Sequence, residues 1–386
     1  MTRTPTSHNG QSDRTGLRVL RRAAVTLGLT VPILLGAGTG LAATASAEPL
    51  WPGPAPVAPV VPVGPSGVPM GANFHGMWSS YTDAQRILIL DGLKSAGADS
   101  VRLDVAWAML QPTGPGTYDA WGTAFVDRVI AMANARGIKP LVMLWTTPGW
   151  ANNNTGGRAL PTNPADYARV AQWAATRWHG KVVGWEVWNE PNSNSFMVGA
   201  DPVAYTRLLK AAYPAFKAGS PTTPVITGGV EYNDTNWLTR MYAAGAKGSF
   251  DAIATHPYMG IADASPALPD DGTMWTFTHA AAVHRLMVAN GDGAKKLWFT
   301  EFGWSTHATA AGSANWNRGV TDTTQADLVA KAASVVDATM PYVARMYLYS
   351  ERDTNTGNLQ YDSYGIYRWN FTVKPVLAAI RTINAT

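Results

Sequence analysis

After Met70, the sequence predicts a single (β/α)8 TIM barrel, an α/β fold of eight parallel strands that are each followed by a helix. Eight short apolar runs recur as far as the C-terminus, and amphipathic patterns separate them. Apolar strands that alternate with helices are typical of a parallel sheet covered on both faces. No Gly-x-Gly-x-x-Gly fingerprint follows the first run, which argues against a doubly wound nucleotide-binding sheet.

The predicted helices between these runs begin with recognisable signals. Thr82 and Gln85 form a predicted capping box. Asn163-Pro164 and Asp201-Pro202 predict an N-cap followed by proline in the first turn. The eight predicted strands are Met70–Phe74, Ser100–Val105, Ile138–Trp145, Val182–Trp188, Val225–Gly229, Ala252–His256, Leu297–Thr300 and Val343–Tyr349.

Residues 1–47 have the pattern of a secretory signal peptide. Arginines precede an apolar stretch at residues 23–43, and the small-residue site Ala45-Ser46-Ala47 predicts cleavage after Ala47. Proline and glycine interrupt the stretch, which favours cleavage over an uncleaved anchor and predicts no stable membrane span in the mature protein. The pair Arg21-Arg22 leaves general secretion and twin-arginine export both open. We expect a secreted or cell-envelope protein.

Residues 48–69 contain eight prolines and predict an extended, polyproline-like linker. This segment is either a cell-wall spacer or an inert leader. The predicted barrel occupies residues 70–386. Because the chain has no cysteine, an exported barrel must be stabilised by its core, and a domain of this size can bury enough surface for that.

The predicted signal peptide also accounts for the basic charge of the chain. The whole sequence has 30 Lys and Arg against 26 Asp and Glu, of which residues 1–47 hold five arginines and one aspartate, so residues 48–386 carry 25 of each. The folded part is therefore formally neutral. We expect no nucleic-acid partner and no anionic membrane surface as partner, and we expect a monomer.

Candidate site residues follow from the fold, because active sites of these barrels lie at the carboxyl ends of the strands. His256 is interpreted as a hydrogen-bonded site residue and not as a metal ligand, since no second ligand accompanies it at ligand spacing. Glu186 has the same orientation along its strand as Glu190 and is expected to pair with a buried arginine. The fifth strand offers no readable site residue. The candidates are His75, Arg102, Trp145, Trp150, Asn189, Glu190, His256, Tyr258, Glu301, Trp304 and Tyr349.

Two of these candidates are glutamates in similar aromatic settings. Glu190 lies in Trp-Glu-Val-Trp-Asn-Glu-Pro-Asn, and Glu301 lies in Leu-Trp-Phe-Thr-Glu-Phe-Gly-Trp. A glycosidase that retains configuration needs two carboxyls about 5 to 5.5 Å apart, one ionised and one protonated. Arg102 and Tyr258 are available to keep Glu301 charged, whereas Glu190 is expected to hold its proton beside that charge. This chemistry requires no metal and no organic cofactor.

The two glutamate segments together resemble clan A of the glycoside hydrolases. From about Gly71 to the C-terminus the chain is most similar to family 39 and to the cellulase-like enzymes of family 5. Further matches are Val101-Arg102-Leu103-Asp104, Thr147-Pro148-Gly149-Trp150-Ala151, His256-Pro257-Tyr258 and Lys374-Pro375. The resemblance implies that Glu190 is the acid/base and that Glu301 is the nucleophile.

The resemblance also implies supporting roles. Asn189 would bind the sugar 2-hydroxyl, and Arg102 and Tyr258 would hold the nucleophile. Many clan members end the eighth strand with a tryptophan that forms a floor for the reacting sugar, whereas this chain has Tyr349 there. Either Tyr349 stacks in its place, or the loop at residues 351–353 contacts a substituted or charged sugar; an ordinary solvated loop is the third interpretation.

We therefore expect an exported retaining O-glycosidase that acts on a polysaccharide or oligosaccharide, in endo fashion through an open cleft. An exo-acting enzyme such as a xylosidase or arabinofuranosidase is the closest alternative. A non-catalytic carbohydrate-binding envelope protein is the other alternative. It would need a broken acid, nucleophile or support residue, and none is missing from the sequence.

Overall fold

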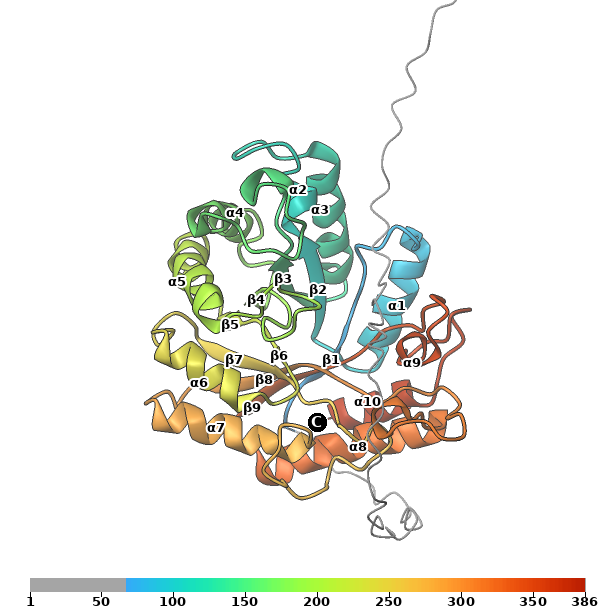
Figure 1. Ribbon diagram of the computed structural model, residues 1–386. Helices are drawn as coiled ribbons and strands as arrows, with labels where there is room; N and C mark the ends of the chain where they lie inside the picture. The colour runs from blue at the N-terminus through green and yellow to red at the C-terminus, as the bar shows by residue number, and fades with distance from the viewer. Residues whose placement is uncertain (1–66, 386) are drawn as a thin grey trace, which may run out of the picture. The chain divides into compact units, whose positions relative to one another are not determined.

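The computed structural model describes residues 67–385, which form a closed parallel barrel surrounded by helices (Figure 1). The strands follow one another in the order β5-β4-β3-β2-β1-β9-β8-β7-β6, and β5 also pairs with β7 through Ile226 and Ala252. This last pairing closes the sheet, so the predicted (β/α)8 barrel is confirmed. The predicted signal peptide, and the predicted linker as far as residue 66, lie outside the described residues.

Eight strands match the predicted runs, with ends that differ by at most two residues, and β6 is additional. The strands are β1 Met70–Asn73, β2 Ser100–Ala106, β3 Lys139–Trp145, β4 Gly184–Val187, β5 Val225–Thr227, β6 Val230–Glu231, β7 Ala252–His256, β8 Lys296–Phe302 and β9 Val343–Leu348. The helices are α1 Asp83–Ser95, α2 Trp107–Leu110, α3 Ala120–Asn134, α4 Pro164–Arg177, α5 Pro202–Gly219, α6 Thr235–Ala243, α7 Ala280–Ala289, α8 Asp322–Thr339, α9 Leu359–Asp362 and α10 Val376–Asn384.

The fifth strand differs from its prediction. It ends at Thr227, and after two glycines the chain forms β6, which pairs with β7. A Cβ added at Gly229 would lie 2.3 Å from Nε2 of His256. Only glycine lets the backbone pass so close to the imidazole. The apolar pattern could not show this break, because it continues through both glycines.

The predicted helix starts are confirmed. Thr82 Oγ1 accepts the Gln85 N–H at 3.2 Å, and Gln85 Oε1 accepts the Thr82 N–H at 2.8 Å, which completes the capping box of α1. Asn163 and Asp201 cap α4 and α5 with one side-chain bond each, to the N–H two residues further on, and each precedes a first-turn proline. These bonds satisfy N–H groups that would otherwise have no partner at a helix start.

Apolar side chains pack on both sides of the barrel wall. On the outer side, Trp185 stacks with Trp178 and Phe216 under the helices. A smaller cluster lies apart from this layer and packs across the strands, so the barrel is filled and not a pore. Its buried members are Leu141, Ile226, Ala252, Ala254, Trp298 and Tyr347.

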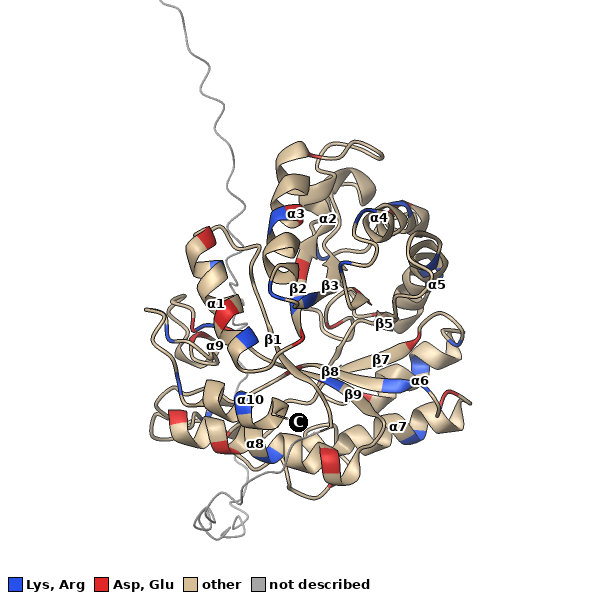
Figure 2. Ribbon diagram, turned by 180° about the vertical axis from the view of Figure 1, so that it is seen from behind, with Lys and Arg blue, Asp and Glu red and all other residues tan. Residues whose placement is uncertain are grey.

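Charged residues of both signs are interspersed over the helices (Figure 2). This distribution agrees with the equal numbers of acidic and basic residues in residues 48–386. Within residues 67–385, the longest helices are too polar or too short to cross a membrane.

Candidate active site

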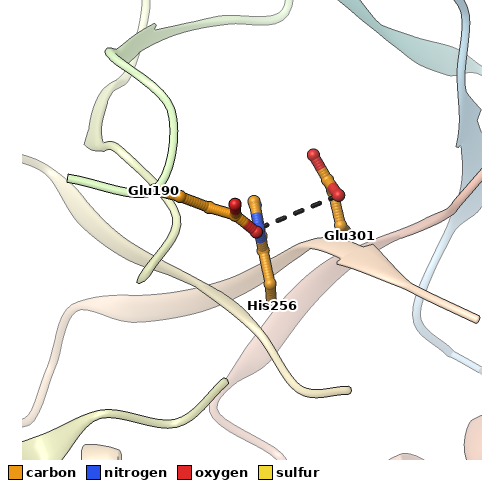
Figure 3. Close-up of side chains that lie close together, drawn as sticks. All are labelled: Glu190, His256 and Glu301. Carbon is orange, nitrogen blue, oxygen red and sulfur yellow. Dashed lines mark hydrogen bonds and ion pairs between the residues drawn. The ribbon is translucent and has the colours of Figure 1, made fainter. Parts of the chain in front are cut away.

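Four strands bring the central candidates together. Arg102 lies on β2, Glu190 follows β4, His256 ends β7, and Glu301 lies on β8. The chain leaves β4 through positive φ angles, +73° at Trp188 and +38° at Glu190. Non-glycine residues rarely adopt such angles, and this strain concentrates at functional sites. The turn directs Glu190 towards β7 and β8 (Figure 3).

The two glutamates lie on either side of His256 (Figure 3). His256 Nδ1 is 2.8 Å from Glu190 Oε1 and 3.9 Å from Glu301 Oε2. Burial and the positive charge of Arg102 hold the pKa of His256 well below its ordinary value, so its contact with Glu190 is a hydrogen bond that involves a neutral ring and not an ion pair. The other ring nitrogen lies 3.0 Å from Thr300 Oγ1, which fixes the orientation of the imidazole.

Glu301 lies between a cation and a hydroxyl group. Arg102 Nη1 donates to Glu301 Oε1 at 2.6 Å, and the Tyr258 hydroxyl donates to Glu301 Oε2 at 2.9 Å. Both donors favour the ionised carboxylate. The two residues predicted to hold this glutamate therefore contact it directly.

Arg102 also connects two residues of the β4 segment. Its Nε donates to Glu186 Oε2 at 2.5 Å, and its Nη2 donates to Asn189 Oδ1 at 2.7 Å. Glu186 is fully buried, so the predicted pairing with a buried arginine is confirmed. Because Oδ1 of Asn189 accepts this bond, the amide NH2 of Asn189 remains available for another partner.

The surroundings of the two glutamates separate their pKa values. Burial, together with the negative charges of Glu301 and Glu231, holds the pKa of Glu190 well above its ordinary value. Burial also raises the pKa of Glu301, but Arg102 and the Tyr258 hydroxyl oppose the increase. Glu190 therefore keeps its proton at a pH where Glu301 is ionised.

Glu190, His256 and Glu301 also form a set of possible cation ligands, with donor atoms no more than 4.8 Å apart. Two carboxylates therefore lie beside His256 in the folded protein, although none lies at ligand spacing from it in the sequence. Arg102, however, places a guanidinium nitrogen 2.6 Å from Glu301, and this positive charge opposes a second cation. The donor set therefore suits proton transfer better than metal binding.

His75 and Glu351 form a second polar cluster. Glu351 accepts the backbone N–H of His75 at 3.0 Å and the Tyr81 hydroxyl at 2.8 Å, and it lies 2.9 Å from His75 Nδ1. Burial opposes protonation of His75, but the charge and hydrogen bond of Glu351 raise its pKa overall. Trp78 stacks on His75 with ring centroids 4.2 Å apart. A buried carboxylate thus orients an imidazole towards the site.

The loop after β9 is a buried support. Glu351 is fully buried and Arg352 is 3 % exposed, so the solvated-loop interpretation is wrong. The Arg352 guanidinium lies over the rings of Tyr81, Trp369 and Phe371, at 4.1 to 4.7 Å from their centroids. Both side chains are buried, which leaves neither exposed to a sugar, although Arg352 Nη2 has no hydrogen-bond partner within residues 67–385.

Tyr349 lies where the floor residue was predicted. Its half-buried ring meets Tyr258 and His75 edge-on, with centroids 6.5 and 5.6 Å away. Burial and the charges of Glu301 and Glu351 hold its pKa well above the ordinary value, so its hydroxyl keeps its proton. Its position agrees with the interpretation in which Tyr349 replaces the floor tryptophan.

The predicted tryptophans do not form one open stacking surface. Trp145 is 8 % exposed, and Trp150 is half-buried, with Nε1 donating to the Gln111 carbonyl at 2.7 Å. Trp304 is 2 % exposed and packs edge-on against Phe302, which leaves almost none of its ring open to a ligand. After a strand ends, side chains no longer alternate, and sequence spacing does not show which way a ring points.

A comparison with protein-family models matches residues 63–335 to the cellulase model, glycosyl hydrolase family 5. The chain belongs to this family. It is therefore a clan A glycoside hydrolase, as the resemblance implied.

Curated relatives and solved structures are similar to this family 5 enzyme over part of their length. Beta-glucosidase 40 from Arabidopsis thaliana is 28% identical over 142 residues, 35% of this chain and 28% of that protein. A family 39 glycoside hydrolase from Bacteroides cellulosilyticus has TM-score 0.66 at 23% identity, covering 82% of this chain and 63% of that one. A monomeric beta-xylosidase from Caulobacter crescentus has TM-score 0.61 at 19% identity, covering 82% and 67%. At this identity the structures show a shared fold.

No separate role was predicted for Asp104, which belongs to the Val101-Arg102-Leu103-Asp104 match of this family 5 member. It follows Arg102 by two positions on β2, so both have the same orientation along the strand. This alternation was the signal that could have identified it. Asp104 Oδ1 is buried, and within residues 67–385 it has no hydrogen-bond partner. Burial raises the pKa of Asp104, although the charges of His75 and Arg102 lower it. A substrate hydroxyl could supply the missing partner.

Gly229 and Asn192 were also missed, and both position the segment that carries Glu190. The Gly229 carbonyl accepts the Glu190 N–H at 3.0 Å. Asn192 Oδ1 accepts the Glu231 N–H at 2.7 Å, and Asn192 Nδ2 donates to the Glu231 carbonyl at 3.0 Å. The Gly228-Gly229 pair inside the apolar run was the available signal for Gly229. Nothing in the sequence connects Asn192 with Glu231.

Proposed function

We propose that this enzyme hydrolyses the glycosidic bonds of a polysaccharide or oligosaccharide by a double displacement on two glutamates, with retention of configuration. We base this on the separation of the two carboxyl groups, since Glu190 and Glu301 have oxygen atoms no more than 4.8 Å apart. Retaining enzymes hold their two carboxyls about 5 to 5.5 Å apart, whereas inverting enzymes need about 6.5 to 9.5 Å to admit a water molecule.

In the first step the Glu301 carboxylate attacks the anomeric carbon. Glu190 donates its proton to the leaving oxygen, the glycosidic bond breaks, and a glycosyl–Glu301 ester forms. The hydrogen bonds from Arg102 and Tyr258 orient the attacking carboxylate. The free amide NH2 of Asn189 is placed to donate to the sugar 2-hydroxyl.

In the second step Glu190 acts as a base. Once it has lost its proton, its carboxylate takes a proton from water, and the oxygen of that water attacks the anomeric carbon. The bond to Glu301 breaks, and its electron pair returns to the carboxylate. If the Nδ1 atom of His256 carries its proton, it donates to Glu190 Oε1 and leaves Oε2 free for both proton transfers.

Trapping the intermediate tests the mechanism. 2-Deoxy-2-fluoroglycosyl fluorides of glucose, xylose and mannose are incubated with the purified protein, and the labelled peptide is identified by mass spectrometry. We expect a label on Glu301 with the sugar that the enzyme accepts. Because fluoride leaves without a proton, Glu190→Gln should still be labelled, whereas Glu301→Gln should not.

Asp91→Asn is a matched control, because this carboxylate lies on the surface with 59 % of its side chain exposed. It should be labelled and active like the wild type. Hydrolysis without any label on Glu301, or full activity of Glu301→Gln, would show that the mechanism is wrong. Sugar binding without hydrolysis or label would favour a carbohydrate-binding protein instead.

We also propose endo action on a long chain. Product lengths decide this, since an endo enzyme releases mixed oligosaccharides at early times. Release of single sugars from one chain end would instead support an exo-acting enzyme. Screening defined polysaccharides would provide the substrate for this measurement.

Export of the protein is a further part of the proposal. It rests on the arginines, the apolar stretch and the Ala45-Ser46-Ala47 site. N-terminal sequencing of protein recovered from the culture medium or the cell envelope should begin at Glu48. Recovery of the uncut chain from the cytoplasm would contradict export.

A further inference from the structure

Three aromatic residues from separate segments lie around Glu190 on the side of β6. Tyr232 directly follows β6, and its ring meets that of Trp275 with centroids 4.4 Å apart. Tyr361 belongs to α9. Trp275 is 45 % exposed and Tyr361 is 54 % exposed, so both present ring surface to solvent. We call Tyr232, Trp275 and Tyr361 the aromatic platform.

Contacts place this platform beside the proton donor. Tyr232 forms a backbone bridge with His256, whose ring is bonded to Glu190. Burial and the charges of Glu231 and Glu190 raise the pKa of Tyr232 to about 12. Burial and, to a smaller extent, the charges of Glu231 and Glu190 also raise the pKa of Tyr361. Both hydroxyls therefore keep their protons and can donate to a ligand.

The platform is held in place by backbone hydrogen bonds. The Trp275 carbonyl accepts the Gly260 N–H at 2.9 Å, and a Cβ added at Gly260 would lie 2.8 Å from the Trp275 Cβ. Buried Asn233 donates to the carbonyls on both sides of Trp275, from its backbone N–H to Met274 at 3.3 Å and from its Nδ2 to Thr276 at 2.9 Å. Tyr232 has φ +58°. An exposed ring fixed in this way is preorganised for a ligand.

Glu231 adds an acceptor to the same surface. Asn192, two residues after Glu190, holds the Glu231 backbone through two hydrogen bonds. The Glu231 side chain is half-buried, and its charge contributes to the raised pKa of Glu190. The segment that contains Glu190 thus also holds the Glu231 backbone at the edge of the platform.

The position of Glu190 determines which part of the substrate the aromatic platform binds. Glu190 protonates the leaving oxygen, so the part of the substrate on its side is the leaving group. We propose that the aromatic platform and Glu231 form the leaving-group subsite and bind a neutral pyranose unit of the chain. This inference rests on the proposed function.

Two properties of the site favour a sugar over an aromatic aglycone. Aromatic faces pack against the CH groups of a pyranose, while the hydroxyls of Tyr232 and Tyr361 and the carboxylate of Glu231 can bond its hydroxyl groups. An aryl group would leave these polar atoms without partners, which costs free energy. A uronic acid would meet the negative charge of Glu231.

Reactivation of the trapped enzyme tests this subsite separately from the first displacement. The 2-fluoroglycosyl–Glu301 enzyme is freed of excess fluoride and incubated with cellobiose, xylobiose or mannobiose, with benzyl alcohol, or with buffer alone. A hydroxyl of the acceptor attacks the anomeric carbon and gives its proton to Glu190. The new C–O bond replaces the bond to Glu301, whose electron pair returns to the carboxylate.

We expect at least one disaccharide to accelerate reactivation beyond that in buffer and beyond that with benzyl alcohol. Trp275→Ala and Tyr361→Ala, which change different segments, should each raise the half-saturating disaccharide concentration by about tenfold, as expected for the loss of one stacking ring. Reactivation in buffer is measured for each variant, and acceleration by the disaccharide is expressed relative to it. Trp121→Ala is the control, because Trp121 is 61 % exposed on α3 and should change nothing.

Three results would overturn the inference while leaving the proposed function intact. In the first, Glu301 is labelled but no disaccharide accelerates reactivation. In the second, disaccharides accelerate reactivation equally in both platform variants and in the wild type. In the third, benzyl alcohol accelerates reactivation more than any sugar does. Failure to label Glu301 at all would overturn the proposed function, and the subsite with it.

Discussion

Tyr258→Phe tests how Glu301 is kept ionised, because it removes a single hydroxyl and keeps the ring. This hydroxyl donates to Glu301 Oε2 at 2.9 Å. Burial and the charge of Glu301 hold the pKa of Tyr258 well above its ordinary value, so it is a protonated donor at any working pH. Arg102 remains on the other carboxylate oxygen. The variant therefore removes one of the interactions that lower the pKa of Glu301 and leaves the charges of Arg102 and His75 in place.

The expected shift follows from the strength of that bond. A hydrogen bond to a charged group contributes about 1.5 to 3 kcal/mol, and one pKa unit corresponds to about 1.36 kcal/mol. The pKa of Glu301 should therefore rise by about 1 to 2 units. Because the nucleophile works only when ionised, the acidic limb of kcat/KM against pH should move to higher pH by that amount. The basic limb, set by Glu190, should stay near its wild-type position.

Tyr364→Phe is the matched control. Tyr364 meets Tyr258 edge-on with ring centroids 6.1 Å apart, and among residues 67–385 its hydroxyl makes no hydrogen bond to Glu301. Its pH profile should follow that of the wild type. An acidic limb of Tyr258→Phe that coincides with the wild-type limb would refute the reasoning, and equal shifts in the two variants would point to repacking of the aromatic side chains.

Three other substitutions test the acid, the buried ion pair and a helix cap. Glu190→Ala should lower kcat on a substrate with a poor leaving group by about 10² to 10⁴-fold, and azide should restore turnover with a glycosyl azide as product; no rescue would contradict the acid/base role. Arg102→Met leaves buried Glu186 without its ion-pair partner, and urea unfolding should show a loss of about 3 to 5 kcal/mol; unchanged stability would contradict this. Thr82→Ala removes the cap of α1 and should cost about 1 kcal/mol, with kcat unaltered; a changed kcat would link this cap to the site.

Local patterns in the sequence were enough to predict the architecture. Strand positions followed from apolar runs, and helix starts followed from caps such as Thr82 and Asn163, whose bonds span only a few residues. The pairing of Glu186 with a buried arginine followed from the alternation of side chains along a strand. Each of these features depends on near neighbours in the chain.

The site was predictable only where a residue lies on a strand or directly after one. Arg102 and Glu301 lie within strands, so the barrel itself places them together. The surroundings of Glu351 could not be predicted, because its partners His75 and Tyr81 precede it by 276 and 270 residues. The direction of the Trp304 ring could not be predicted for a related reason, since loop packing decides it.

By itself, the sequence determined that this chain forms a (β/α)8 barrel with two glutamates at strand ends, because periodicity and strand-end position are properties of a local stretch. Only the tertiary structure decided how far apart the two carboxyls lie and which of them keeps its proton. Those properties depend on Arg102, Tyr258 and Glu231, which come from three other parts of the chain. Distances of a few ångströms and the loss of water around a charge exist only after the chain has folded.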